Sequence, residues 1–302
     1  METKFQNNLF YYKFEGDEYL AGKEYSKLLL QRSFDINVIK SVNDDIWNFI
    51  KEKNGGIVYR LLKKRIIQWL KIIKRDYKDY ILFQKGFADG FDVDIDFLLE
   101  LDISIEVSGL FCTISAEKNQ FYRILDTSLE HRNLLKKIFN EIHIIKINDY
   151  TIVSNPGYLC LHTVISDKFS FGTFANNFLD KKKYLQNELP FYIKLKKYYQ
   201  DSKNETDFIN FINAENKINY DVDIILQGKN KNYIIDVMNS KNNKESDNML
   251  EKSDYSPIKT DDLFNLHKEL PDFSRIFVVL FKDNKLYVNN SLINNELIEI
   301  KI

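Results

Sequence analysis

The chain has 302 residues, of which 44% are hydrophobic and 29% are charged, and it contains 23 Phe and 18 Tyr. This composition is typical of a folded protein with a large apolar core and excludes an intrinsically disordered chain. The 43 Lys and Arg residues nearly balance the 44 Asp and Glu residues. The net charge of −1 therefore gives no electrostatic reason to expect nucleic acid or a membrane as a partner.

Cysteine content and the N-terminus indicate a reducing compartment. The chain contains two cysteines, Cys112 and Cys160, so we do not expect a disulfide framework. The N-terminus lacks a basic region followed by an apolar core, so we expect no signal peptide. No stretch approaches the roughly 20 continuous apolar residues of a membrane span. We therefore expect a cytoplasmic protein, which suits chemistry that needs a free thiol.

The first third of the chain is expected to be mostly helical. Apolar residues recur at helical spacing over residues 17–84, and Asn54-Gly55-Gly56 interrupts the pattern. Residues 86–100 predict a turn followed by a short helix, with Asp92 or Asp94 as its N-cap.

After residue 108 the pattern changes to short β-branched and aromatic runs, which predict strands. The expected strands are 109–117, 120–127, 141–147, 150–154, 157–165, 168–174, 220–227, 232–238, 275–281 and 284–289. Helices are expected at about 187–200, 205–214 and 260–269. The polar residues 239–259 predict a loop. This order of elements predicts an α+β fold with two antiparallel sheets between helices.

Cys112 lies near the start of the strand-like run Gly109-Leu110-Phe111-Cys112-Thr113-Ile114-Ser115-Ala116. The next predicted strand carries Arg123-Ile124-Leu125-Asp126, and a Gly-x-Ala-x-Gly segment starts at Gly86. Other segments follow in a consistent order along the chain, namely Phe14 to Tyr25, Asn155-Pro156-Gly157-Tyr158-Leu159, Glu188 to Lys194 and Tyr220 to Val237.

In this order the segments resemble the cysteine N-terminal-nucleophile (Ntn) hydrolases related to acyl-coenzyme A:6-aminopenicillanic acid acyltransferase. The resemblance implies a four-layer αββα fold and a chain that cuts itself before Cys112. Residues 1–111 would then be a helical pro-segment packed on the core, and residues 112–302 the catalytic domain, the two forming one functional unit.

The resemblance also implies a mechanism. Cleavage would give Cys112 a free amine, whose unperturbed pKa of about 8 suits it to accept the thiol proton. The thiolate would attack an amide or thioester carbonyl and pass the acyl group from Cys112 to water or an amine. Asp126 would orient the amine or thiol, and Arg123 would hold that carboxylate or one on the substrate. Neither a cofactor nor a metal is needed.

Two hydrogen-bond donors should stabilise the oxyanion of such a reaction. Backbone N–H groups could serve, and the candidate side chains for the oxyanion or the substrate are Thr113, His162, Thr163, Asn176 and Asn248. The sequence does not choose among them. The partners implied are a small-molecule acyl donor and an amine or water as acceptor.

Several alternatives remain open. A lone cysteine in an apolar strand is often a buried small hydrophobe, and Cys160 is interpreted in this way. Ile124 replaces the usual Asn after the arginine, and the bulky Phe111 precedes the cysteine. These departures favour an uncleaved protein that binds a ligand or partner without turnover.

A remote alternative is a metal-dependent nuclease that uses Asp223, Asp236 and Lys241. The lysine is missing from its usual place two residues after the acidic one, and the chain lacks a basic surplus. His131, His143 and His267 show no metal-ligand spacing with one another or with the cysteines.

Overall fold

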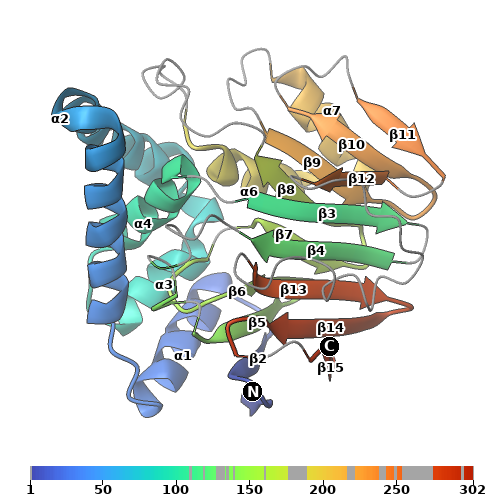
Figure 1. Ribbon diagram of the computed structural model, residues 1–302, viewed down its shortest axis with the longest axis horizontal. Helices are drawn as coiled ribbons and strands as arrows, with labels where there is room; N and C mark the ends of the chain where they lie inside the picture. Colours follow the sequence, from blue (N-terminus) through green and yellow to red (C-terminus); the bar gives the residue numbers. More distant parts are fainter. Residues whose placement is uncertain are drawn as a thin grey trace.

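The structure is a computed structural model. It describes residues 2–108, 111–117, 120–126, 133, 136–138, 140–159, 161–175, 189–215, 222–237, 243–247, 250–253, 275–293 and 296–301. This part of the chain is a mixed α+β protein in which two β-sheets are stacked and helices pack beside them (Figure 1).

The helices of the first third agree with the sequence pattern. They are α1 (Glu18–Gln31), α2 (Asn37–Asp76), the short 3-10 helix η1 (Lys78–Tyr80), α3 (Leu82–Gly90) and α4 (Ile95–Ser108). The interruption predicted within α2 is confirmed, because Gly55 there has φ 80° and ψ 162°, which are not helical. The Asp94 carboxylate accepts a hydrogen bond of 2.9 Å from the Asp96 N–H, as expected of an N-cap.

The larger sheet, sheet A, has nine strands in the order β1-β2-β5-β6-β7-β8-β9-β10-β11. Their bounds are β1 (Glu2–Lys4), β2 (Leu9–Phe14), β5 (Ile142–Ile147), β6 (Tyr150–Ser154), β7 (Thr163–Ser166), β8 (Ser170–Ala175), β9 (Val222–Gln227), β10 (Asn232–Asp236) and β11 (Lys244–Ser246). Neighbouring strands are antiparallel except β2 and β5, which are parallel.

The second sheet, sheet B, has six strands in the order β12-β3-β4-β13-β14-β15. They are β3 (Phe111–Glu117), β4 (Gln120–Asp126), β12 (Leu250–Ser253), β13 (Arg275–Lys282), β14 (Lys285–Asn290) and β15 (Ile298–Ile300). Strand β3 lies against β8 and β9 of sheet A, and β4 lies against β8. The two sheets therefore pack face to face, with β3 and β4 in front of β7 and β8 in Figure 1.

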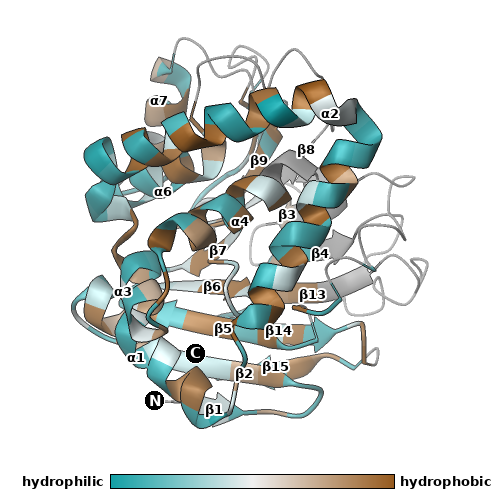
Figure 2. Cartoon of the chain, turned by 90° about the vertical axis from the view of Figure 1, so that its left-hand side faces the viewer, coloured by the Kyte–Doolittle hydropathy of each residue, from teal (hydrophilic) through white to brown (hydrophobic). Residues whose placement is uncertain are grey.

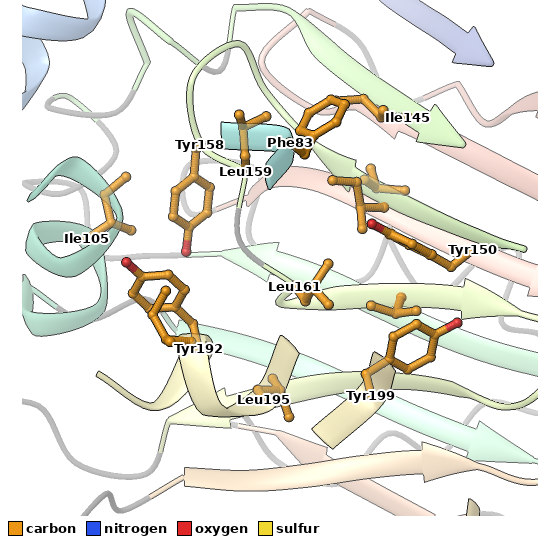
Figure 3. Packing of buried hydrophobic residues seen from close by; sticks show 14 of the residues in the cluster. Phe83, Ile105, Ile145, Tyr150, Tyr158, Leu159, Leu161, Tyr192, Leu195 and Tyr199 are labelled. Atoms are coloured by element: carbon orange, nitrogen blue, oxygen red, sulfur yellow. The ribbon is translucent and has the colours of Figure 1, made fainter. Parts of the chain in front are cut away.

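Helices cover the other face of sheet A. Tyr25 of α1 packs edge-on against Tyr12 of β2 at 4.9 Å between ring centroids. Tyr199 of α6 (Phe191–Asp201) packs against Tyr150, and Phe208 of α7 (Glu205–Ala214) packs against Phe171. Figure 3 shows this apolar layer, including Tyr150, Leu161, Leu195 and Tyr199. The described residues therefore form three layers, which are helices, sheet A and sheet B.

Two glycines explain how closely α1 and α3 approach each other. A Cβ atom added at Gly22 would lie 2.1 Å from the Phe83 carbonyl oxygen, and one at Gly86 would lie 1.9 Å from the Tyr19 carbonyl oxygen. A larger residue at either site would force the helices apart. Gly86 thus packs inside α3 rather than in the turn that the sequence predicts at this point.

The prediction of a loop over 239–259 was wrong in part, because β11 and β12 lie within it. Both are short strands at a sheet edge, where polar side chains are common and the apolar alternation is absent. The predicted strand over 157–165 is shorter, since β7 begins at Thr163. The N-terminal segment also supplies β1 and β2 to sheet A, so it is not purely helical.

The predicted helix at 260–269 lies outside the described residues. Within the described part of the chain, no helix combines the length and the apolar composition that a bilayer crossing requires.

Candidate active site

The register of β3 and β4 fixes where the predicted catalytic residues stand along the sheet. Cys112 pairs with Leu125, and Ile114 pairs with Arg123. Residues directly opposite each other share a face of the sheet, as do alternate residues along a strand. The Cys112 and Arg123 positions therefore lie on the same face of sheet B. Asp126 pairs with Phe111, so its position lies on the opposite face.

Arg123 joins the two sheets. It is 2% exposed, and its Nη1 donates hydrogen bonds to the carbonyl oxygen of His162 and, at 2.7 Å, to Oγ1 of Thr163. Thr163 is itself buried, at the start of β7. A guanidinium stays charged at any ordinary pH, so a permanent positive charge lies between the sheets. The strand that carries Cys112 is the direct neighbour of the strand that holds this charge.

His162 presents its carbonyl group, not its imidazole, to Arg123. Nδ1 of the imidazole lies 2.8 Å from Oγ1 of Thr173, and the ring stacks on Tyr158. Two residues before Thr173, Phe171 packs on Tyr199 of α6, so Thr173 stands on the helix-facing side of β8. The imidazole therefore lies on the face of sheet A that is turned away from sheet B.

The imidazole of His162 is uncharged at ordinary pH. Burial lowers the pKa of His162 to about 3, and the nearby charge of Arg123 acts in the same direction. Its Nε2 is buried and has no hydrogen-bond partner among the described residues. His162 can thus accept or donate a hydrogen bond, but it does not supply positive charge.

Asn155 is a candidate that sequence reasoning missed. It directly follows β6 and is 0% exposed, and neither Oδ1 nor Nδ2 has a hydrogen-bond partner within the described part of the chain. A buried amide without partners costs about 1–3 kcal/mol, so its presence calls for an explanation. Its backbone bridges to Tyr158, whose ring stacks on His162. Asn155 is therefore available to hydrogen-bond a ligand near the start of β7.

A signal for Asn155 existed in the sequence. It stands directly after the run Tyr150–Ser154, every residue of which is buried in the structure. A polar residue that follows a fully buried strand at a Pro-Gly turn often serves a site at the strand end. The Pro156-Gly157 pair by itself predicts only the start of a strand.

For the other predicted residues the structure gives fewer contacts or none. Thr113 pairs with Ile124 on β4 and with Ser253 on β12. Asn176, Asn248, Cys160 and Lys241 lie outside the described residues. Asp223, which is 2% exposed, pairs directly with Asp236 across β9 and β10. Among the described residues, no group of three His, Cys, Asp or Glu side chains could hold a metal ion.

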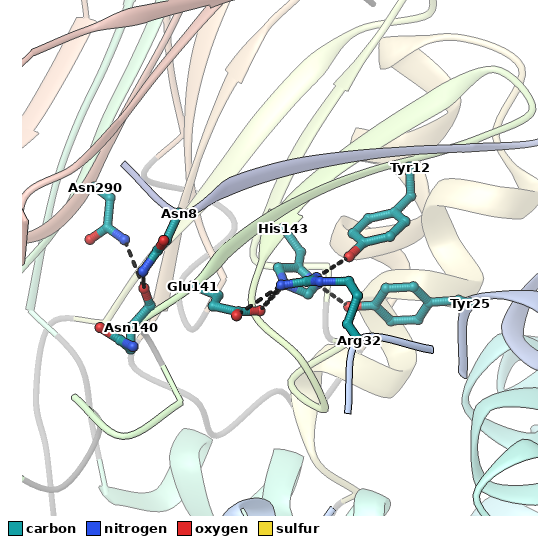
Figure 4. A network of polar contacts seen from close by, with 8 residues as sticks. All are labelled: Asn8, Tyr12, Tyr25, Arg32, Asn140, Glu141, His143 and Asn290. Atoms are coloured by element: carbon teal, nitrogen blue, oxygen red, sulfur yellow. Dashed lines mark hydrogen bonds and ion pairs between the residues drawn. The ribbon is translucent and has the colours of Figure 1, made fainter. Parts of the chain in front are cut away.

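A second polar network joins α1 to sheet A (Figure 4). The Tyr25 hydroxyl lies 2.5 Å from Nδ1 of His143, whose Nε2 lies 3.0 Å from Glu141. Arg32 donates to both Glu141 oxygens at 2.8 Å and to the Tyr12 hydroxyl at 2.6 Å. Burial lowers the pKa of His143 to about 4, although the hydrogen bond with Glu141 acts in the opposite direction.

The same network affects Glu141. Burial raises the pKa of its carboxyl group, but the contacts with His143 and Arg32 outweigh this and leave the pKa lowered. With neutral His143 and ionised Glu141, every polar group of the network has a partner. We infer that this network holds the N-terminal segment against the rest of the fold.

No model of a known protein family matches this sequence, and a comparison with curated proteins finds no similar chain. The candidate site is therefore defined by geometry, through the β3 register, the buried Arg123 and the unpartnered Asn155 amide.

Proposed function

We propose that the protein is a cysteine Ntn amidohydrolase or acyltransferase with the four-layer αββα fold. The observation that carries the proposal is the buried Arg123 guanidinium between two stacked sheets, on the same face of sheet B as the Cys112 position on the neighbouring strand. The three layers of helices, sheet A and sheet B agree with this fold.

In the proposed reaction, the free amine of Cys112 takes the thiol proton, and the thiolate attacks an amide or thioester carbonyl. A carbon–sulfur bond forms as the bond to the leaving group breaks, and the leaving group takes up the proton. Water or an amine then attacks the acyl-enzyme, and the thiol is released. The amide of Asn155 is well suited to donate to the oxyanion, because it is buried and has no other partner in the described structure.

The Asp126 position does not share a face of the β3–β4 ladder with Cys112. For Asp126 to orient the amine or thiol of Cys112, the strands would have to depart from regular pleating there. Arg123 would act as a fixed positive charge that stabilises a substrate carboxylate or a developing oxyanion beside it.

A second candidate is an uncleaved binding protein. The favouring observation is that β3 begins at Phe111, which pairs with Asp126 in the same ladder as Cys112. The peptide bond that should break therefore lies inside a hydrogen-bonded strand. In that case the buried Asn155 amide would bind a ligand that is not turned over.

The deciding experiment is the intact mass of the purified protein under denaturing conditions, for the natural sequence, Cys112→Ala and Cys160→Ala. The enzyme proposal expects two fragments whose masses add up to that of the 35.9 kDa chain, with a break before Cys112. The fragments should persist in Cys160→Ala and be absent in Cys112→Ala. A break that survives in Cys112→Ala would overturn the proposal.

A single uncut species of the natural sequence would favour the binding protein. Iodoacetamide labelling then separates the remaining cases. A Cys112 that reacts faster than Cys160 indicates a thiol activated by another base, whereas an unreactive Cys112 leaves only the binding role.

A further inference from the structure

The second half of α2 exposes a face that is cationic and partly apolar. Residues 57–75 contain seven Lys or Arg residues and no Asp or Glu. The exposed residues of this stretch are Ile57, Arg60, Leu61, Lys64, Ile67, Gln68, Lys71, Lys74 and Arg75, which we call the α2 cationic face. At 100° per residue they all fall within a sector of about 140°. The net charge of −1 for the whole chain conceals this local segregation.

Three of the cations on the α2 cationic face lack an acidic neighbour. Lys74 pairs with Asp96, and Arg75 with Asp76, at the end of the helix. Within the described residues, Arg60, Lys64 and Lys71 have no ion-pair partner. Their charges therefore project into solvent along the middle of the face.

Apolar side chains are interspersed with these cations. Ile57 is 74% exposed, Leu61 44% and Ile67 57%. The opposite side of the same helix is buried, through residues such as Leu62, Ile66 and Trp69. Figure 2 shows α2 as an outer element of the fold, with hydrophilic and hydrophobic residues alternating along it. The exposed apolar groups are thus additional to those that α2 needs for its own packing.

The shape and chemistry of the face select among anionic partners. A helix of 20 residues is about 30 Å long, so its exposed stripe offers roughly 300 Å², below the ~800 Å² per partner of a stable protein interface. Nucleic acid would gain little from exposed Ile and Leu side chains. An anionic lipid surface uses both features, since lysine and arginine meet the headgroups while apolar side chains enter the boundary with the acyl chains.

We propose that the α2 cationic face docks the protein on the surface of a membrane that contains anionic phospholipids. Attachment is peripheral and needs no bilayer crossing. It does not depend on chemistry at Cys112, so the inference stands apart from the proposed function.

The test is co-sedimentation of the full chain with phosphatidylcholine vesicles that contain about one quarter phosphatidylserine, and with pure phosphatidylcholine vesicles. We expect binding to the first that weakens as salt is added, and little binding to the second. Lys64→Glu with Lys71→Glu should weaken binding by about tenfold or more, because each reversal replaces attraction by repulsion. Ile57→Ser with Leu61→Ser should weaken binding even at low salt.

The matched control is Lys203→Glu with Lys229→Glu, which makes the same change in net charge at exposed sites on other elements. This control should keep the binding of the natural protein. Equal loss in the control and the α2 variants would show a non-specific charge effect and overturn the proposal. Absence of vesicle binding at low salt would also overturn it, as would tighter binding to single-stranded RNA or polyglutamate than to the anionic vesicles.

Discussion

The hydroxyl of Tyr25 lies 2.5 Å from Nδ1 of His143, in a part of the core where both residues are 0% exposed. Tyr25 belongs to α1 and His143 to β5, so this contact connects the N-terminal helices to a strand that lies in sequence between Arg123 and Asn155. In the neutral imidazole, the tautomer that donates from Nε2 to Glu141 leaves Nδ1 free to accept from the Tyr25 hydroxyl.

Acid should destabilise the fold through His143. An unfolded histidine titrates near pH 6.5, whereas burial lowers the pKa of His143 in the folded chain to about 4. Between these values the unfolded state binds more protons, so the free energy of unfolding should rise with pH from about 4 to 6.5. The titration of His143 changes the free energy of unfolding by about 3 kcal/mol across this pH range. Urea unfolding at a series of pH values measures the slope.

His143→Gln should reduce the slope of the free energy of unfolding against pH. The contribution of His162 should remain, because burial lowers the pKa of His162 to about 3. His162→Gln is the matched variant and should leave the His143 part in place. An unchanged slope in His143→Gln would show that His143 does not titrate as its burial requires.

Arg32→Met should destabilise the protein at neutral pH. The change removes the bidentate pair with Glu141 and the hydrogen bond to Tyr12 but keeps an apolar stem over Phe10. We expect a loss of about 1–3 kcal/mol, because charged hydrogen bonds in a partly buried site are lost. Lys13→Met is the control, since the Lys13–Glu15 pair is well exposed and should contribute nothing measurable. Equal effects of the two substitutions on thermal unfolding would contradict this interpretation.

The contact between α1 and α3 depends on the absence of a Cβ atom at Gly86. We expect Gly86→Ala to cost about 3 kcal/mol, because the new atom would lie 1.9 Å from the Tyr19 carbonyl oxygen, and backbone cannot move aside cheaply. Gly56→Ala, with no atom within 4 Å of the added Cβ, should be neutral or stabilise by up to about 1 kcal/mol. Melting temperatures of the two variants measure the contrast. A tolerant Gly86→Ala would show that the helices separate freely.

Asn155→Leu separates a ligand-binding role from a structural one. Removing a buried amide that makes no hydrogen bond should leave stability unchanged or raise it. If Asn155 donates to the oxyanion, the same variant should form the acyl-enzyme about 100 to 1,000 times more slowly. Acylation by a chromogenic thioester and thermal unfolding are the two measurements.

Asn43→Leu provides the comparison for Asn155→Leu. Asn43 is also buried, but its side-chain oxygen accepts a hydrogen bond from Ser104 at 3.0 Å, so this substitution should destabilise the protein. A similar loss of stability in both variants would identify Asn155 as structural.

Sequence periodicity predicted most elements of the fold because their apolar faces are regular. The strand expected at 120–127 forms as Gln120–Asp126, and the helix at 205–214 forms as Glu205–Ala214. It could not predict β11, where Lys244, Glu245 and Ser246 form a strand only by pairing with β10. Nor did it predict β2, whose place beside β5 depends on residues far along the chain.

The candidate site was harder to predict for a related reason. Spacing along the chain placed Arg123 near Cys112, and the β3–β4 ladder agrees with that. Spacing could not show which face of a sheet a side chain takes. It therefore could not show that His162 contacts Arg123 through its carbonyl oxygen and not through its imidazole. The sequence shows Asn155 only as a polar residue after an apolar strand, and its burial without hydrogen-bond partners became visible in the structure.

The parallel pairing of Leu9–Phe14 with Ile142–Ile147 has a consequence for the newly made chain. A ribosome adds about 5–20 residues per second, so β2 waits roughly 6 to 26 seconds before its partner emerges. During that time the apolar strand Leu-Phe-Tyr-Tyr-Lys-Phe has one unpaired edge. A chaperone that shields this edge, or a slow rate of translation that prolongs its exposure, should therefore affect the yield of folded protein more than the stability of the final structure.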